Sequence, residues 1–193
     1  MSPARARTSH AAIVAAARDL LEAGGLEAVS MAAIAERVGI RPPSLYKHFA
    51  GRDALLIAVV TDVAFDLGRA LALAIEPSGT DAAGRLRALA DAYRAYALRS
   101  PRATALLFAP AVPGLDPSPE ANAAAARPVL EVATALAGPG GALAAARVLT
   151  AFAHGFTSME SAGAFRLGGD VNAAYRVGIE GLLAGLQRPP TAG

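Results

Sequence analysis

The stretch VSMAAIAERVGIRPPSLYKHFAGRDALL, residues 29–56, decides the fold because it predicts two short helices joined by a glycine turn. Ser30 can cap a first helix over residues 31–38, since its hydroxyl can accept a hydrogen bond from an early backbone amide. Gly39 follows and can adopt the left-handed backbone that a tight corner requires. The second helix is expected over residues 42–49, so the stretch predicts a helix-turn-helix.

The second helix is expected to bury one face and expose the opposite one. Pro42 and Pro43 suit its first turn, where a missing backbone N–H is no loss. Leu45 and Phe49 point to the same side of a helix, toward a core. Lys47 lies about 180° from the midpoint of that pair. A buried anchor on one side and a cation on the other are therefore predicted.

The polar face of this helix has the composition of a nucleic-acid contact. Ser44 lies beside Pro43 and Lys47 on the exposed ridge, and the rings of Tyr46 and His48 fall about 80° to either side of the buried face. A ridge of this kind can enter a major groove with phosphates on both sides.

The run IAERVGIRPPSLYKHFAGRDALL, residues 34–56, resembles the DNA-binding segment of TetR-type transcriptional regulators. The resemblance is strong from His10 to Leu56, because many positions agree at fixed spacing. Arg52 takes the place of the family's usual lysine and keeps its charge. The other matching positions are Ile34-Ala35, Gly39-Ile40, Leu45-Tyr46, His48-Phe49 and Leu55.

This resemblance implies operator DNA as a partner. Lys47 and Ser44 are the candidates for base edges, and Pro42 or Pro43 can contact a thymine methyl group. Tyr46 can either pack its edge on the core or contact phosphate. Phosphate contact is favoured because the family's matching tyrosine and histidine make it. The predicted DNA-binding residues are Ser30, Arg41, Pro42, Pro43, Ser44, Tyr46, Lys47, His48 and Arg52.

Arg52 is expected to hold a phosphate together with backbone amides. The residue opens a helix, where a cation is unfavourable beside the positive end of the helix dipole. A phosphate bound there by the amides and the guanidinium would reverse that penalty. Ser30, Tyr46 and His48 are the other predicted phosphate contacts.

The composition gives little support to an enzyme or a metal protein. The 193 residues are 54% hydrophobic, enough for a sizeable core, and include no cysteine, which excludes disulfides and thiolate metal sites. The three histidines, His10, His48 and His154, have no second metal ligand at i+3 or i+4. The motifs of serine nucleophiles, phosphate loops and dinucleotide sites are absent. No catalytic residue, metal or cofactor is expected.

The net charge of +2 arises entirely within residues 1–53, which carry seven basic and five acidic side chains, whereas residues 54–193 carry eleven of each. Such an excess can arise by chance or can mark a DNA-binding end of the chain, and the motif favours the second interpretation. The N-terminus lacks the apolar core of a signal peptide, and charges or helix breakers interrupt every long apolar window. A cytoplasmic protein without a membrane span is expected.

Helical periodicity continues to the C-terminus, and no stretch alternates like a strand. We expect an all-α fold of nine helices, the number that the TetR family uses, with Pro128 kinking or breaking the seventh. Three regions are predicted: a helix-turn-helix domain over 1–53, a ligand-binding and dimerisation domain over 54–187, and a flexible tail over 188–193. The expected helices cover 9–23, 31–38, 42–49, 52–75, 81–99, 101–110, 120–137, 142–167 and 171–186, with a proline-rich loop over 110–119.

The last two expected helices carry small residues at helical spacing, which let helix backbones approach closely. These rows can serve packing within one chain. They can also form a two-fold four-helix interface, as the resemblance implies and as a protein that needs two DNA-binding heads favours. The predicted dimerisation residues are Ala151, Gly155, Ser158, Ala162, Ala174, Gly178, Leu182 and Gly185.

The C-terminal region also contains aromatic residues that can either form a plain core or line a chamber for a small apolar effector. His154-Gly155 resembles the Trp-His-Gly signature of one TetR subfamily, but the chain has no tryptophan and Phe152 is the nearest upstream ring. The predicted ligand-binding residues are Tyr93, Tyr96, Phe108, Phe152, His154, Phe156 and Met159.

These expectations combine into a homodimeric, effector-responsive repressor of a pseudo-palindromic operator. Two other classes stay open. One is an activator or inducer-independent DNA-binding protein, and the other is a small-molecule-binding protein whose DNA specificity has degenerated.

Overall fold

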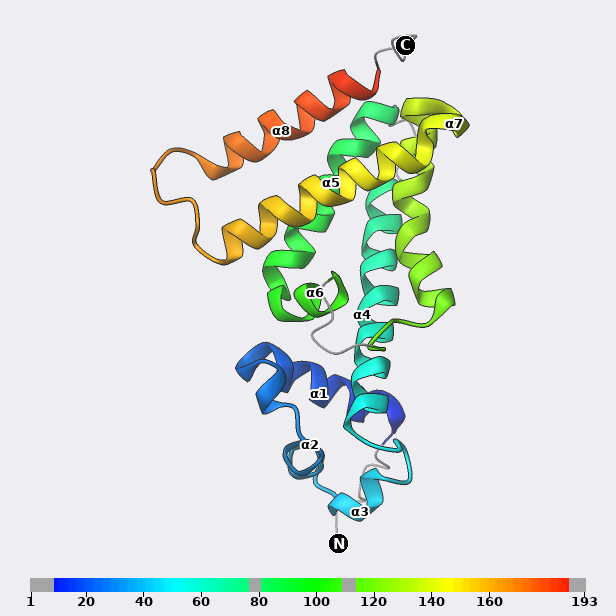
Figure 1. The fold of residues 1–193 in the computed structure, drawn as a ribbon, viewed down its shortest axis with the longest axis vertical. Coiled ribbons are helices and arrows are strands. Elements are labelled where there is room, and N and C mark those ends of the chain that lie inside the picture. Colours follow the sequence, from blue (N-terminus) through cyan, green and yellow to red (C-terminus); the bar gives the residue numbers. More distant parts are fainter. Residues whose placement is uncertain (1–8, 77–80, 109–113, 188–193) are drawn as a thin grey trace, which may run out of the picture. The chain divides into compact units, whose positions relative to one another are not determined.

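The computed structural model describes residues 9–76, 81–108 and 114–187, and all regular elements in these ranges are helical (Figure 1). This confirms the all-α fold class. The predicted tail over 188–193 and part of the predicted loop over 110–119 lie outside the described residues. The helices are α1 His10–Gly24, η1 Leu26–Ala28 (a 3₁₀ turn), α2 Met31–Arg37, α3 Pro42–Leu45, α4 Arg52–Ile75, α5 Ala82–Arg99, α6 Pro101–Phe108, α7 Pro119–Ser161 and α8 Val171–Leu186.

The described residues form eight α-helices instead of the nine expected, because α7 joins two predicted helices across a kink. The backbone is non-helical at Gly138, with φ 69° and ψ 170°. Pro139 follows, and proline suits the first turn of the segment beyond the kink. The predicted kink at Pro128 is wrong: Pro128 lies buried within the helical part of α7.

The C-terminal end of α7 also differs from the expectation. The predicted helix over 142–167 ends at Ser161. Gly163 has φ 63°, and the amide of Ala164 donates to the carbonyl of Met159 over 2.9 Å. A left-handed glycine with this six-residue hydrogen bond is the Schellman ending of a helix. Residues 162–170 therefore form the connection to α8.

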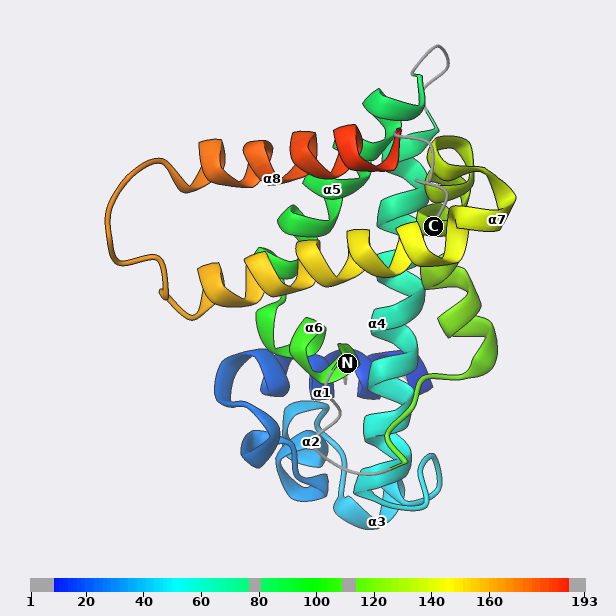
Figure 2. The same cartoon turned by 45° about the horizontal axis from the view of Figure 1, so that its top comes forward.

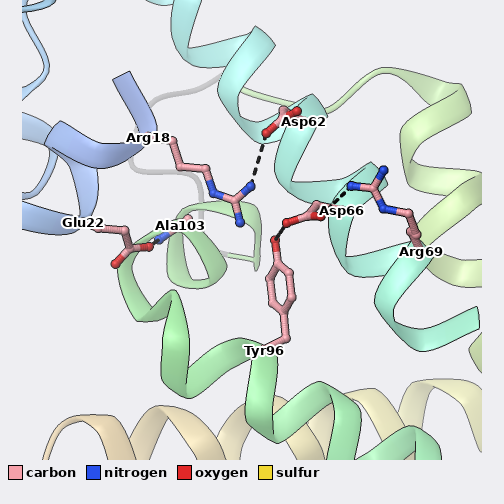
Figure 3. Close-up of polar contacts among 7 residues, drawn as sticks. All are labelled: Arg18, Glu22, Asp62, Asp66, Arg69, Tyr96 and Ala103. Carbon is pink, nitrogen blue, oxygen red and sulfur yellow. Dashed lines mark hydrogen bonds and ion pairs between the residues drawn. The ribbon is translucent and has the colours of Figure 1, made fainter. Parts of the chain in front are cut away.

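The chain divides into two compact units, and the first comprises Met1–Val63 with Arg102–Ser118. Besides the helix-turn-helix segment, this unit contains the first half of α4 and most of α6. The guanidinium of Arg18 on α1 pairs with Asp62 on α4 at 3.2 Å. The Glu22 carboxylate accepts from the amides of Arg102 and Ala103, at 3.2 and 2.7 Å, and thereby caps α6 (Figure 3). The first unit thus extends beyond the predicted domain over 1–53.

The second unit comprises Ala64–Pro101 and Pro119–Gly193. It contains the second half of α4, α5, α7 and α8, and the last part of α7 runs alongside α8 in both ribbon views (Figures 1 and 2). Tyr96 on α5 donates to Asp66 on α4 over 3.4 Å, and Asp66 also pairs with Arg69 (Figure 3). Arg94 on α5 forms a bidentate pair with Glu160 on α7, at 2.8 and 2.5 Å.

Helix α7 is also long and apolar enough to cross a membrane by length and composition alone. Its most apolar window has a mean hydropathy of 1.4 and is 28% buried. The helix is bent at Gly138 and packs against α5 and α8, so we interpret it as a domain helix with one uncovered apolar face. An uncovered apolar face is a feature of protein interfaces.

Gly68 marks a close approach of α4 to the backbone of α7 in the second unit. A Cβ at this position would lie 2.5 Å from the Ala124 carbonyl oxygen on α7. Pro128 has no N–H, so this carbonyl lacks the amide donor that an α-helix normally supplies four residues later. Glycine at position 68 lets the backbone of α4 approach the Ala124 carbonyl, to which Pro128 cannot donate a hydrogen bond.

Gly68→Ala is expected to lower the free energy of unfolding by about 1–3 kcal/mol, because a backbone atom cannot move aside as a flexible side chain can. Gly140→Ala is the matched control, since a Cβ there meets no atom within 4 Å. The control should leave stability unchanged or slightly raised. Urea denaturation of both variants checks this, and equal midpoints for Gly68→Ala and the wild type would contradict the close approach.

Candidate nucleic-acid interface

The corner of the helix-turn-helix forms as the sequence predicts. The Ser30 hydroxyl accepts from the amide of Ala33 over 3.1 Å, which confirms the N-cap of α2. Gly39 has φ 71°, the left-handed conformation expected for the turn. The amide of Ile40 then donates to the carbonyl of Ala35 over 2.9 Å. The direction of the chain leaving α2 is therefore set by local hydrogen bonds.

The second helix is shorter than predicted. Regular α-helix covers only Pro42–Leu45, whereas residues 46–48 form tight turns. The amide of His48 donates to the carbonyl of Leu45 at 2.9 Å, a bond that spans three residues instead of four. Such bonds tighten the last turn of a helix. We call residues 42–49 the recognition segment.

The two faces of the recognition segment are as predicted. Leu45 is fully buried and Phe49 is 5% exposed, and the ring of His10 lies on Phe49 with centroids 4.4 Å apart. Tyr46 is 55% exposed, so about half of its surface is open to solvent. The remaining exposed candidates are Arg41, Pro42, Pro43, Lys47 and His48, with Ser44 partly exposed. The polar ridge is thus presented to solvent over an apolar anchor.

Arg52 has a different environment from the one predicted. Its Nε donates to the Val29 carbonyl over 2.7 Å, and one terminal nitrogen donates to the Leu26 carbonyl over 2.6 Å. The side chain is partly buried at the start of α4. The partial negative charges of these two carbonyl oxygens take the place of the phosphate that was expected to bind the Arg52 guanidinium. We therefore no longer expect a phosphate contact from these two nitrogen atoms.

Two family models match the chain. The model for bacterial regulatory proteins of the tetR family matches residues 13–59, which include the helix-turn-helix described above. The model for a tetracyclin repressor-like C-terminal domain matches residues 86–182. The chain belongs to the TetR family.

Individual relatives of this TetR-family protein give the same assignment. The HTH-type transcriptional regulator Rv1816 of Mycobacterium tuberculosis is 31% identical over 114 residues, which are 58% of this chain. The chain spans about half of the length of that relative, 48%. The uncharacterized HTH-type transcriptional regulator Rv0681 of the same species is 30% identical over 97% of this chain and 86% of its own length.

A solved structure shows the same fold over the whole chain. A protein of unknown function from Rhodococcus sp. RHA1 is 28% identical and superposes with a TM-score of 0.83. The match covers 97% of this chain and 100% of the Rhodococcus chain. The helical arrangement of both units therefore recurs in a related protein.

Two of the predicted effector-binding residues of this TetR-family protein, Phe152 and Phe156, belong to a cluster of aromatic rings. Phe152 and Phe156 on α7 lie against Tyr175 on α8, with ring centroids 5.7 and 5.0 Å apart, and Phe165 lies 4.8 Å from Phe156. We call these four rings the aromatic cluster. Of the other predicted positions, Met159 is half-exposed, and Phe108 belongs to the first unit.

A polar pair lies on the neighbouring side of α7. The Tyr93 hydroxyl on α5 is 3.1 Å from Nδ1 of His154. Burial lowers the pKa of His154 and raises the pKa of Tyr93, so both groups are neutral at neutral pH. The Nδ1 of a neutral imidazole can accept a hydrogen bond from the Tyr93 hydroxyl. Both residues were predicted ligand contacts, but their pairing across 61 positions cannot be read from the sequence.

The predicted dimerisation residues divide into an exposed set and two partly buried positions. Gly178 and Leu182 are partly buried, and a Cβ on Gly178 would lie 2.1 Å from Cζ of Phe152 within the same chain. Gly178 thus serves the packing of α8 on α7. The exposed positions, which we call the small-residue face, are Ala151, Gly155, Ser158, Ala162, Ala174 and Gly185.

Exposed apolar side chains adjoin the small-residue face. Val148 is 47%, Met159 is 50% and Val177 is 72% exposed. Packing within the chain therefore leaves these surfaces of α7 and α8 uncovered.

In the part of the chain that the structure describes, no group of three or more His, Asp or Glu side chains is arranged to hold a metal ion.

Proposed function

We propose that this chain is a homodimeric transcriptional regulator that binds operator DNA through the recognition segment. The observation that supports this most is the exposed ridge of Tyr46, Lys47 and His48 above the buried pair of Leu45 and Phe49. In the proposed complex, Lys47 and Ser44 contact base edges, while Ser30, Tyr46 and His48 contact phosphates. A protein that regulates transcription in this way is expected in the cytoplasm.

Dimerisation follows from the geometry of DNA recognition. One head, made of α1, η1, α2 and α3, contacts only a few base pairs, and helix-turn-helix proteins gain affinity by using two. The small-residue face, with Val148, Met159 and Val177 beside it, offers an exposed apolar surface along the last part of α7 and along α8. We propose that two copies meet there about a two-fold axis.

We further propose that the regulator is a repressor released by a small apolar effector. Support comes from the Tyr93–His154 pair, which can orient a polar group, and from the aromatic cluster, which can supply apolar contact. The same rings also contact one another, which favours the alternative of an inducer-independent DNA-binding protein.

A footprint on the DNA next to the protein's own gene tests the proposed function. The expected result is that the wild type protects a symmetric site, and that Lys47→Ala protects the same site only at a higher protein concentration. Protection that no apolar compound reverses would favour the inducer-independent alternative. Binding of an apolar compound without any DNA protection would favour a small-molecule-binding protein with degenerate DNA specificity.

An effector that releases the operator must bind the DNA-bound protein more weakly than the free protein, by about 5- to 150-fold. Thermal-shift screening of aromatic and apolar compounds can identify a candidate, and calorimetry with and without operator DNA then measures both affinities. His154→Phe should weaken binding of the compound without changing operator affinity, since His154 belongs to the second unit and the recognition segment to the first. A compound with equal affinity for both forms is not the inducer.

A further inference from the structure

The guanidinium of Arg52 joins the beginning of α4 to the turn that precedes α2. Its Nε and one terminal nitrogen donate to the Val29 and Leu26 carbonyls, which lie 23 and 26 residues earlier in the chain. These distances, 2.7 and 2.6 Å, are typical of hydrogen bonds to a charged donor. Arg52 therefore connects the start of α4 to the turn before α2 through two hydrogen bonds.

The two carbonyls belong to the short element η1 and its end. The Leu26 carbonyl also accepts from the amide of Val29 over 3.2 Å, which closes the 3₁₀ turn. The Val29 side chain is 1% exposed, and Ser30, the N-cap of α2, follows directly. Fixing Val29 thus fixes the position from which α2 and its cap begin.

The residues proposed to contact DNA flank this connection. Ser30 follows Val29, and the Tyr46–His48 turn ends four residues before Arg52. Phosphates on a DNA duplex have fixed spacing, so contacts from both sites require Ser30 and the turn to keep a fixed separation.

We infer that Arg52 is a positioning residue that holds Ser30 and the Tyr46–His48 turn at the separation required by DNA. This inference rests on the proposed DNA-binding function. In this role Arg52 affects DNA binding by positioning Ser30 and the Tyr46–His48 turn, and it does not itself contact a phosphate.

The choice of arginine over lysine supports this role. A guanidinium offers several donors in a rigid planar fork, so two of them can bind two carbonyls at once. A lysine ammonium is a compact charge on a flexible stem and cannot reproduce the fork. This chain has arginine where the resembling pattern has lysine, and the two carbonyl bonds give a physical reason for that difference.

Two substitutions separate positioning from phosphate contact. Arg52→Lys keeps the charge and loses the fork, whereas Arg52→Gln loses both. The probe is a DNA duplex enriched by selection with the wild-type protein. Affinity is measured at several salt concentrations, well below the unfolding temperature of each variant. Arg127→Gln, on an exposed arginine of α7, is the matched control for lost charge.

The inference predicts that both Arg52 variants bind the duplex about tenfold or more weakly, the loss that a charge-assisted hydrogen bond typically causes. The slope of log affinity against log salt should stay at the wild-type value. If Arg52 instead contacts phosphate, the lysine variant should bind like the wild type. The glutamine variant should then lose about 0.9 from the slope for each head. That result, or wild-type affinity in both variants despite lower melting temperatures, would overturn the inference.

The Nε–H resonance of Arg52 provides a second measurement that needs no variant to fold. In the free wild-type protein this proton should exchange slowly with solvent, because the Val29 carbonyl holds it. Its NMR signal should barely move when the selected duplex is added. Rapid exchange in the free protein, or a large shift on adding DNA, contradicts the inference. Failure of the wild type to enrich any duplex counts against the proposed function instead. The exchange rate of the Arg52 Nε–H in the free protein still tests whether the Val29 carbonyl holds the guanidinium.

Discussion

Operator affinity is expected to fall by about 10³- to 10⁵-fold when salt is raised from about 50 to 200 mM, as for proteins with about six to ten phosphate contacts. Ser30, Tyr46 and His48 supply three proposed contacts in each head, and a dimer doubles that number. Each contact releases a counterion from the DNA, so the loss is steep. Fluorescence anisotropy across a salt series measures it. A nearly flat salt response would rule out the proposed phosphate contacts.

Single substitutions separate the two kinds of contact within this salt-dependent binding. Tyr46→Phe should weaken all DNA sequences about equally, because a phosphate contact carries no sequence information. Lys47→Ala should relax the preference at one base position by about 1–3 kcal/mol. If Lys47→Ala lowers affinity for every sequence by the same factor, Lys47 contacts phosphate and its assignment to a base edge is wrong.

The second large effect is expected from Gly155→Leu, which should convert the dimer into a folded monomer. A Cβ on Gly155 meets no atom within 4 Å of the chain, so leucine projects outward and leaves the monomer intact. In the proposed interface the same side chain separates two helix backbones that must approach closely. Operator affinity should fall by about 10²- to 10⁴-fold, the gain that linking two binding modules provides.

Light scattering and circular dichroism together check this expectation. Ala135→Leu is the matched control, because Ala135 is exposed on the first segment of α7, away from the small-residue face. The control should remain dimeric. A helical Gly155→Leu variant with the mass of a dimer would remove the small-residue face from the interface. Gly178→Leu is unsuitable for this test, because it would disrupt the contact with Phe152 inside one chain.

Local chemistry explains why the helix-turn-helix could be predicted. The cap at Ser30 and the left-handed Gly39 each depend on neighbours within a few residues, and the spacing of Leu45 and Phe49 puts both on one face of the segment. The length of α3 could not be predicted, because the same turn can close through bonds spanning three or four residues.

Contacts between distant residues explain what the sequence did not reveal. The Arg52 fork depends on carbonyls more than 20 residues away, so the charge of Arg52 alone equally favoured a phosphate. Pro128 was expected to bend α7, but the kink lies at Gly138. The roles of glycines also differ in ways that spacing cannot show: Gly178 packs on Phe152, whereas Gly155 faces solvent.

Selection of DNA from a random pool by the purified protein, followed by sequencing, tests the proposed function most directly. Two recognition segments related by a two-fold axis should enrich an inverted repeat, with half-site centres about 10–10.5 base pairs apart or a multiple of that distance. Lys47→Ala should enrich the same repeat with one position in each half-site relaxed. Enrichment of no sequence, or of a single unpaired half-site by the dimer, would contradict operator recognition by this protein.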